Sequence, residues 1–317
     1  MSQSATDPLA GLSLEQIPNP EPPEGWVRVH MRSCALNHHD LWSLRGVGLE
    51  VSRLPMTLGC DGAGVLDDGT EVVIHAVLGN PEVADGDETL DPKRTLLSEL
   101  HQGTLAEMVV VPQHNVILKP KSLSWEDAAC MPSAWLTAYR MLTTRSALHG
   151  PSTVLVQGAG GGVATAAIQI ASALGHTVYC TSRDEEKRAR SLSLGAVLAV
   201  EPGQRLPTKV DLVIETVGAA TWDHSLRSLR AGGRIVVSGA TSGSSPPADL
   251  NRVFFLQLSV VGSTMGTRAE FVDMLKFVET TGLRPIIDQV RPLEEAAQAF
   301  ERLHTGLGFG KQVLTVG

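Results

Sequence analysis

The sequence contains few cysteines, no long apolar run and no excess of positive charge. Its four cysteines, Cys34, Cys60, Cys130 and Cys180, form no C-x-x-C pair among 317 residues. This usage argues against a disulfide framework and a four-thiolate zinc knot, and it is typical of a reducing cytoplasm. No apolar stretch reaches membrane-spanning length, and the first residues lack the basic start and apolar core of a signal peptide.

The net charge of the chain indicates which kinds of partner it binds. A net charge of −8 disfavours a nucleic-acid surface or an anionic membrane surface. A hydrophobic content of 43% over this length is enough for one large or two moderate domains. We therefore expect a cytoplasmic protein whose partner is a small molecule, with no nucleic acid and no membrane involved.

Residues 153–175 are the most informative segment, because they combine a strand, a glycine-rich turn and a helix. The apolar run at 154–156 is typical of a parallel strand buried on both faces. The glycines at 158 and 160–162 allow a tight turn and a close ligand approach. The helix that follows would offer unpaired N–H groups to a pyrophosphate. The G-x-G-x-x-G pattern fits only in a relaxed frame, so an ordinary strand-to-helix turn stays open as the alternative.

The rest of the chain divides into stretches of different pattern. Up to about residue 116 short strands and loops predominate, with a polar loop at residues 79–103. Residues 124–149 have helical spacing and a cap-like start at Ser124 and Asp127. Strands and helices then alternate, and the tail from residue 270 reads as two helices and a closing strand.

The end of the second strand in the alternating part predicts the cofactor. An NAD-selective site carries an acidic residue there, which binds the ribose hydroxyls and repels a 2′-phosphate. Here Ser182 and Arg183 stand in that place, and Lys187 follows. A hydroxyl and a guanidinium suit a phosphate, so we favour NADP(H) over NAD(H). The alternative is that Arg183 and Lys187 are ordinary solvated charges.

The chain resembles the medium-chain dehydrogenase/reductase superfamily, in its zinc-independent quinone oxidoreductase-like branch. The matching strings run in order along nearly the whole chain: ALNHHDLWSLRG, LGCDGAGV, GTLAEMVVVP, WEDAACMPSAWLTAYRML, VLVQGAGGGVATAAIQIASALG, ETVG, GGRIVVSGATSG and SVVGSTMGTRAEF. The resemblance implies an α/β fold with a GroES-like, mostly β barrel domain for catalysis (residues 1–120 plus 268–317). It also implies a Rossmann domain with a doubly wound parallel sheet (residues 121–267).

The resemblance also bears on zinc. Zinc-dependent relatives use three protein ligands, typically thiolate, imidazole and thiolate, and the matching positions here are Asn37, Cys60 and Ser133. Only Cys60 is a good zinc ligand, because an amide and a neutral hydroxyl bind zinc poorly. The loop at 79–103, which corresponds to the structural-zinc lobe, has no cysteine. We therefore expect no zinc.

Without a metal, reduction of a conjugated acceptor stays accessible, since the charge can collect on a carbonyl oxygen held by hydrogen-bond donors. The predicted catalytic residues are Asn37, Asp40 and Cys60. Asn37 would donate to that oxygen, and Asp40 would shape the site through the family's Asn-x-x-Asp element. A turn capped by its own side chains is the alternative for both, and Cys60 is either a reactive thiol or a small buried residue. The neighbouring His38 and His39 read as local hydrogen-bonding residues, with metal ligation as the alternative.

Further cofactor contacts follow from motif position in the resemblance. They are Thr137, Gly161, Gly162, Val163, Ser182, Arg183, Lys187, Thr216, Val217, Gly218, Ser238, Gly239, Ala240, Thr241, Phe309 and Lys311.

Three functions remain in view. The leading hypothesis is an NADPH-dependent reductase that transfers hydride to a quinone or an α,β-unsaturated carbonyl without a metal. The others are an alcohol dehydrogenase with an atypical zinc site and a nucleotide-binding protein with little turnover. The apolar strand LSVVGSTM is expected to pair across a two-fold axis, which predicts a homodimer through the edge of the Rossmann sheet.

Overall fold

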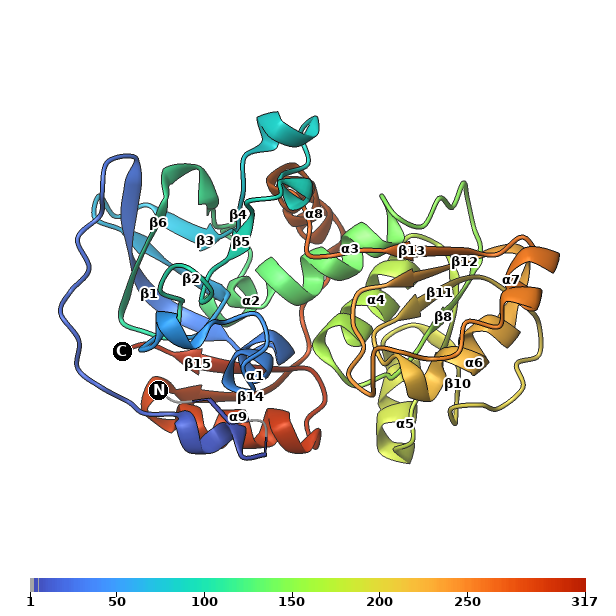
Figure 1. The fold of residues 1–317 in the computed structure, drawn as a ribbon. Helices are drawn as coiled ribbons and strands as arrows, with labels where there is room; N and C mark the ends of the chain where they lie inside the picture. The colour runs from blue at the N-terminus through green and yellow to red at the C-terminus, as the bar shows by residue number, and fades with distance from the viewer. Residues whose placement is uncertain (1–2, 5) are drawn as a thin grey trace. The chain divides into compact units, whose positions relative to one another are not determined.

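The computed structural model describes residues 3–4 and 6–317, and it divides into two compact units (Figure 1). The first unit is Met1–Ala134 with Gly266–Gly317, and the second is Trp135–Met265. The first boundary lies further along the chain than residue 120, where the sequence placed it. The reason is that helix α2 (Trp125–Ala129) packs against strands β1 and β2 of the first unit.

Within the described residues, the first unit is built on a seven-stranded sheet with the order β14-β15-β1-β2-β3-β7, and with β6 also paired to β1. The strands in that order are Ile287–Pro292, Lys311–Thr315, Trp26–Ala35, Asp61–Leu66, Glu71–Ile74 and Val116–Leu118, and β6 is Met108–Pro112. Strand β1 pairs antiparallel with both β2 and β15. The tail of the chain therefore completes the sheet that the first hundred residues begin.

One hydrophobic core joins these distant segments. Val29 and Ile74 from the first part of the chain are buried in the same cluster as Phe300 and Leu314 from the tail. The helices of this unit are α1 (His38–Leu44), α2, α8 (Arg268–Thr281) and α9 (Ala296–Thr305). The short 3-10 turns are η1 (Pro8–Gly11), η2 (Val51–Arg53), η3 (Pro81–Ala84), η4 (Glu88–Leu90), η5 (Gln113–Asn115) and η7 (Leu293–Glu295).

The polar segment at 79–103, expected as a loop, is partly regular. It contains η3 and η4, and it returns through strand β5 (Thr95–Leu96), which pairs antiparallel with β4 (Val77–Leu78). The segment expected as one helix over 124–149 is instead two helices. Helix α2 and α3 (Leu136–Leu142) are separated by the π-helical turn Met131–Trp135. The break contains Pro132, which has no backbone N–H to donate.

In the described part of the second unit, a six-stranded parallel sheet has the order β10-β9-β8-β11-β12-β13. Counted along the chain this is 3-2-1-4-5-6, the order of the dinucleotide-binding doubly wound fold. In chain order the strands are Thr153–Val156, Thr177–Thr181, Ala196–Val200, Val210–Glu215, Leu229–Val237 and Ser259–Gly262. The helices are α3, α4 (Gly162–Ala173), α5 (Glu185–Ser193), α6 (Ala219–Ser228) and α7 (Leu250–Phe255).

No helix in the described chain has both the length and the apolar character needed to span a bilayer.

Candidate functional site

The start of α1 places two of the predicted catalytic residues. The backbone N–H of Asn37, the residue before the helix, donates to Asp40 Oδ2 at 2.8 Å. The backbone N–H of Gly59 donates to Asp40 Oδ1 at 3.1 Å. Burial raises the pKa of the Asp40 carboxyl, and the neighbouring His39 opposes that rise. Asp40 therefore joins the first turn of α1 to the segment that leads into β2.

Lys311, at the start of β15, contacts Asn37 directly. Its Nζ donates to Asn37 Oδ1 at 2.6 Å, to Asp61 Oδ2 at 2.9 Å and to the Leu36 carbonyl at 2.8 Å. The side chain is buried, as is that of Asp61. Because Lys311 occupies the side-chain oxygen of Asn37, the amide Nδ2 is the group that this residue can offer to a substrate. One long contact, 3.4 Å to the Ala35 carbonyl, uses part of that amide.

Cys60 lies beside a histidine and a carboxylate. Its Sγ is 3.3 Å from His39 Nδ1 and 3.2 Å from the Leu97 carbonyl. The other ring nitrogen of His39, Nε2, lies 3.1 Å from Glu99 Oε1. Burial raises the pKa of the Cys60 thiol. Burial alone would lower the pKa of His39, but contact with Cys60 and Glu99 outweighs it and raises that pKa.

The three zinc-ligand positions implied by the family resemblance do not fit a metal here. Asn37 Oδ1 already accepts a hydrogen bond from the Lys311 ammonium, and a neighbouring positive charge repels a divalent cation. Ser133 is a buried residue of the π-helical turn, and its hydroxyl is a poor zinc ligand. We therefore derive no catalytic step through a metal held by Asn37, Cys60 and Ser133.

The glycine-rich turn of the second unit has the geometry of a phosphate-binding loop. Gly158 and Gly160 have φ of +70° and +123°, which favours glycine over other residues. A Cβ at Gly160 would lie 2.8 Å from Lys187 Cδ, so the Lys187 side chain lies over the turn. Gly161 precedes α4 and no side chain of the described residues caps that helix. The first-turn N–H groups at Gly162 and Val163 are thus free of a side-chain cap, as a bound pyrophosphate requires.

The end of β9 brings the predicted 2′-phosphate residues next to this turn. The Ala159 N–H donates to the Thr181 carbonyl at 2.7 Å, which ties the turn to β9. Ser182 is buried and Arg183 is exposed. Arg188 Nη1 donates to the Ser182 carbonyl at 2.8 Å, a contact that the sequence did not predict because Arg188 stood among several charged residues of one helix.

A buried carboxylate organises the loop after β11. Glu215 accepts hydrogen bonds from the N–H groups of Val217 at 2.8 Å and Gly218 at 3.0 Å. Its other oxygen accepts from the Ser225 hydroxyl at 2.6 Å. Sequence reasoning missed Glu215 as a site residue, although it opens the ETVG string. It fixes the backbone of the predicted contacts Thr216, Val217 and Gly218.

The loop after β12 lies against this one. The Thr241 N–H donates to the Thr216 carbonyl at 3.4 Å, and a Cβ at Gly239 would lie 3.0 Å from the same oxygen. Ser238 Oγ is buried and has no hydrogen-bond partner in the described chain. The predicted set Ser238, Gly239, Ala240 and Thr241 therefore borders the loop after β11, and Ser238 keeps a hydroxyl available for a ligand.

Two other predicted cofactor contacts are buried. Thr137 lies within α3, and Phe309 is 2% exposed. The Phe309 N–H donates to Asp288 Oδ1 at 3.0 Å. The structure thus groups Asn37, Asp40, Cys60 and Lys311 in the first unit, and most of the other predicted cofactor contacts in the second.

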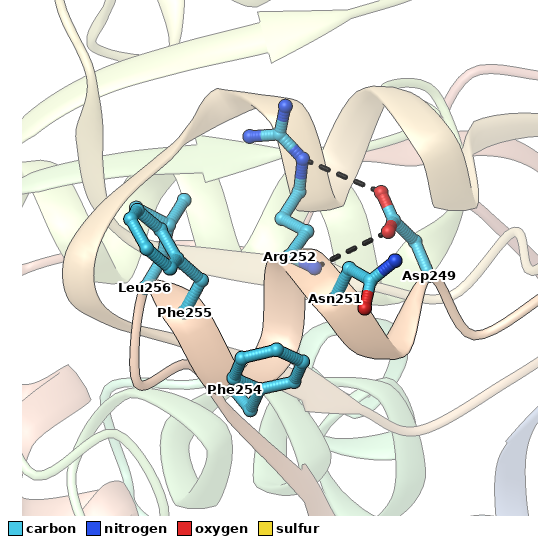
Figure 2. A pocket seen from close by; sticks show the side chains of 6 residues that line it. All are labelled: Asp249, Asn251, Arg252, Phe254, Phe255 and Leu256. Atoms are coloured by element: carbon cyan, nitrogen blue, oxygen red, sulfur yellow. Dashed lines mark hydrogen bonds and ion pairs between the residues drawn. The ribbon is translucent and has the colours of Figure 1, made fainter.

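Residues in and next to α7 line a surface pocket (Figure 2). Arg252 donates from its backbone N–H to Asp249 Oδ1 at 3.2 Å. Phe254 and Phe255 extend from the same helix and are exposed. None of the predicted catalytic or cofactor residues lines this pocket.

Comparison with known proteins identifies the family. Residues 23–121 match the alcohol dehydrogenase GroES-like domain, and residues 162–280 match the zinc-binding dehydrogenase domain. An acryloyl-coenzyme A reductase of Metallosphaera sedula is 30% identical over 96% of each chain. The crystal structure of an NAD-dependent alcohol dehydrogenase is 37% identical, with a TM-score of 0.88, and covers 96% of this chain and 95% of its own. A cobalt- and zinc-bound alcohol dehydrogenase from Pyrobaculum aerophilum is 28% identical, with a TM-score of 0.90, over 99% and 98% of the chains.

The chain belongs to the medium-chain dehydrogenase/reductase superfamily and is an oxidoreductase of that type. The predicted fold class, a Rossmann parallel sheet with a GroES-like domain, is confirmed. The assignment to the zinc-independent branch stays a prediction.

Proposed function

We propose that the protein transfers hydride from NADPH to a carbon–carbon double bond conjugated with a carbonyl group, or to a quinone, with no metal in the hydride step. The observation that carries the proposal is the 2.6 Å hydrogen bond from Lys311 Nζ to Asn37 Oδ1. It places an ammonium on the side-chain oxygen of Asn37, one of the three positions that supply zinc ligands in zinc-dependent relatives. A reduced nicotinamide supplies the hydride, and the remaining steps fall to this chain's own residues.

Asn37 is the proposed electrophilic group. As hydride adds to the β-carbon, the electron pair of the double bond moves onto the carbonyl oxygen, and water supplies the proton to the α-carbon. The amide Nδ2 of Asn37 would donate to that oxygen. The ammonium on the other end of the amide draws electrons from it and strengthens its N–H as a donor. Asp40 holds the Asn37 backbone through its carboxylate and acts as a positioning residue.

The second unit is proposed to bind the cofactor. Gly161, Gly162 and Val163 would bind the pyrophosphate through backbone N–H groups. Ser182, Arg183 and Lys187 would bind the 2′-phosphate, supported by the position of Lys187 over the glycine turn. The NAD-dependent relative at 37% identity keeps NAD(H) as the alternative.

Two of the relatives support different substrates. The acryloyl-coenzyme A reductase at 30% identity supports an α,β-unsaturated thioester as one member of the proposed class. The structure of the NAD-dependent alcohol dehydrogenase favours alcohol oxidation as the second candidate function. We place the protein in the reducing cytoplasm, supported by the four cysteines, which are free and buried.

The test is a substrate panel with both reduced cofactors. Enones, unsaturated acyl thioesters and quinones are offered with NADPH or NADH, and alcohols are offered with the oxidised cofactors. We expect NADPH oxidation with a conjugated acceptor. The variant Asn37→Ala should lower kcat by about 10²- to 10³-fold and leave NADPH affinity unchanged, whereas the control Asn251→Ala, on α7, should change neither. Alcohol oxidation as the sole activity would overturn the proposal. NADPH binding without turnover across the panel would favour the nucleotide-binding protein.

We also propose a homodimer through the edge strand β13. This strand pairs with β12 on one side, and Val260 on it is 48% exposed. In the same unit, Leu250, Phe254 and Phe255 of α7 are exposed. An open strand edge and exposed apolar side chains support association with a second copy.

A further inference from the structure

Three potential metal ligands converge beside the predicted catalytic turn. A nitrogen of His39, a carboxylate oxygen of Asp40 and the sulfur of Cys60 all lie within 4.8 Å of one another. His39 and Asp40 belong to the first turn of α1, and Cys60 directly precedes β2. All three residues lie in the first unit. The cluster therefore combines imidazole, carboxylate and thiol, a donor set that suits zinc better than magnesium or calcium.

The distance between two of the donors matches a shared metal. His39 Nδ1 and Cys60 Sγ are 3.3 Å apart. Zinc holds nitrogen at about 2.1 Å and sulfur at about 2.3 Å in tetrahedral geometry, which separates the two donors by about 3.6 Å. A shift of a few tenths of an ångström would therefore admit the ion in place of the proton that the two atoms share.

Glu99 orients the histidine as metal sites require. His39 Nε2 lies 3.1 Å from Glu99 Oε1. The other carboxylate oxygen is fixed by the Thr95 hydroxyl at 3.0 Å and the Leu96 N–H at 2.9 Å. In the tautomer whose Nε2 proton is directed at Glu99, the imidazole presents the lone pair of Nδ1 toward Cys60. A carboxylate on the outer nitrogen is the usual partner of a zinc-binding histidine.

Asp40 can act as a ligand without losing its backbone contacts. Each of its oxygens accepts one backbone N–H, from Asn37 or from Gly59. A carboxylate oxygen has two lone pairs, so each oxygen keeps one for a cation. On metal binding Cys60 would release its proton, and the resulting thiolate and the Asp40 carboxylate would together neutralise a divalent ion.

A strained residue borders the same cluster and is an independent sign of a site. Ser98 is buried and has φ of +69°, a region that residues other than glycine rarely occupy. Its hydroxyl is 3.8 Å from Cys60 Sγ, and the carbonyl of the preceding Leu97 is 3.2 Å from that sulfur. Such strain tends to be kept where a backbone must hold a functional group in place. Here it holds two oxygen atoms beside the sulfur.

We propose that His39, Asp40 and Cys60 form a binding site for one zinc-type divalent cation, with the Ser98 hydroxyl or a water in the fourth position. The site shares only Cys60 with the ligand positions implied by the family, and it excludes Asn37, whose side-chain oxygen is bonded to Lys311. A cation there would tie α1, the start of β2 and the 95–99 segment together. The proposed hydride step uses the Asn37 amide and not the cation, although Asp40, which holds the Asn37 backbone, takes part in both.

Metal binding itself is the test. Chelator-treated protein is titrated with zinc and with cobalt, followed by elemental analysis, absorption spectroscopy and thermal unfolding. We expect one equivalent of tightly bound metal, a thiolate-to-cobalt charge-transfer band, and a zinc-dependent rise in Tm. Cys60→Ser should abolish the band, and His39→Asn should abolish stoichiometric binding. The matched controls Cys180→Ser and His38→Asn should retain both.

A variant that keeps all three ligands shows whether a loss of metal binding comes from the site or from unfolding. Glu99→Gln should weaken zinc binding by about 10- to 100-fold while the far-UV circular dichroism stays that of the wild type. Failure of the wild-type protein to bind either metal, or a cobalt spectrum that Cys60→Ser does not change, would overturn the site. Loss of NADPH oxidation on metal removal would contradict the metal-free hydride step, yet it would support the site. The two proposals can therefore fail separately.

Discussion

The ammonium nitrogen of Lys311 lies 2.9 Å from a carboxylate oxygen of Asp61, and both side chains are buried. The second oxygen of Asp61 is buried and has no hydrogen-bond partner within residues 3–4 and 6–317. The Lys311 ammonium is thus the main group that offsets the cost of burying the Asp61 charge. A buried charge that loses its partner keeps its full desolvation cost.

We expect Lys311→Met to lower the free energy of unfolding by about 3–5 kcal/mol. The reason is that Asp61 would remain buried without its cation. The double variant Lys311→Met with Asp61→Asn should recover part of the loss, because it removes the uncompensated charge. Urea denaturation of the three proteins measures this, and equal stability of the single and double variants would contradict it.

A substitution at Gly161 should change cofactor affinity without changing the stability of the fold. Its φ of −80° suits any residue, and a Cβ there would meet no described atom within 4 Å. Gly161→Ala should therefore leave the free energy of unfolding within about 0.5 kcal/mol of the wild type. The added methyl would instead occupy the space that a pyrophosphate needs, so NADPH affinity should fall at least about tenfold, or about 1.4 kcal/mol.

Gly160→Ala is the contrasting variant. Gly160 has φ of +123°, and a Cβ added there would lie 2.8 Å from Lys187 Cδ. This change should destabilise the fold as well as weaken binding. Fluorescence titration with NADPH and thermal unfolding of both variants measure the difference. If Gly161→Ala binds NADPH as the wild type does, the pyrophosphate does not lie at this helix.

The secondary structure was predictable where a short stretch of sequence determines it by residue type alone. The run at 154–156 and the glycines that follow define a strand, a turn and a helix by residue type alone, and the structure has β8 and α4 there. The division of residues 124–149 into two helices was not predicted, because the effect of Pro132 depends on how the surrounding turn adjusts. The order of the strands in the first unit joins the tail to β1, and no local pattern encodes such a pairing.

The site was predictable only in part, because its contacts are long-range. Asn37, Asp40 and Cys60 were predicted from motifs and stay predictions. Lys311 and Asp61 are 250 residues apart, and nothing in either motif points to the other. Glu99 lies in a polar segment with no assigned pattern. Its role follows from the position of His39 in space, which the sequence does not give.

Arg183 tests the choice of cofactor. It is exposed at the end of β9, so Arg183→Ala should leave the fold unchanged. NADPH affinity should fall about tenfold, since a charge-assisted hydrogen bond to the 2′-phosphate is lost, and NADH affinity should not change. Arg190→Ala, at the far end of α5, is the control. An equal loss for both cofactors would place Arg183 elsewhere on the nucleotide, and no loss for either would favour NAD(H).

His75 makes the stability of the fold pH-dependent. Burial lowers the pKa of His75 to about 4, although its Nε2 contacts the Gly266 carbonyl at 3.0 Å. The unfolded chain takes up this proton near the ordinary value of 6.5, and the folded chain does not until about pH 4. Stability from this group is thus full above about pH 6.5 and falls as the pH decreases toward 4, by on the order of 3 kcal/mol.

Replacing that residue should remove the dependence. In His75→Gln the loss of stability between pH 6.5 and pH 4 should be smaller than in the wild type. In the control His149→Gln it should be unchanged, because His149 is exposed and is not among the charged groups that shift the pKa of His75. Urea denaturation at several pH values measures the slope. A wild-type slope in His75→Gln would assign the acid sensitivity to other groups.

The two edges of the parallel sheet offer a matched test of the proposed homodimer. Val260 lies on edge strand β13, and Val197 lies on β10 at the opposite edge, where it is 64% exposed. Lysine on an edge strand discourages pairing with another chain, because its charge would be buried in the new interface. Val260→Lys should therefore convert a dimer into a monomer, and Val197→Lys should leave the dimer intact. Size-exclusion chromatography with light scattering measures both. A monomeric wild-type protein would remove the dimer, and a dimer lost only in Val197→Lys would move the interface to β10.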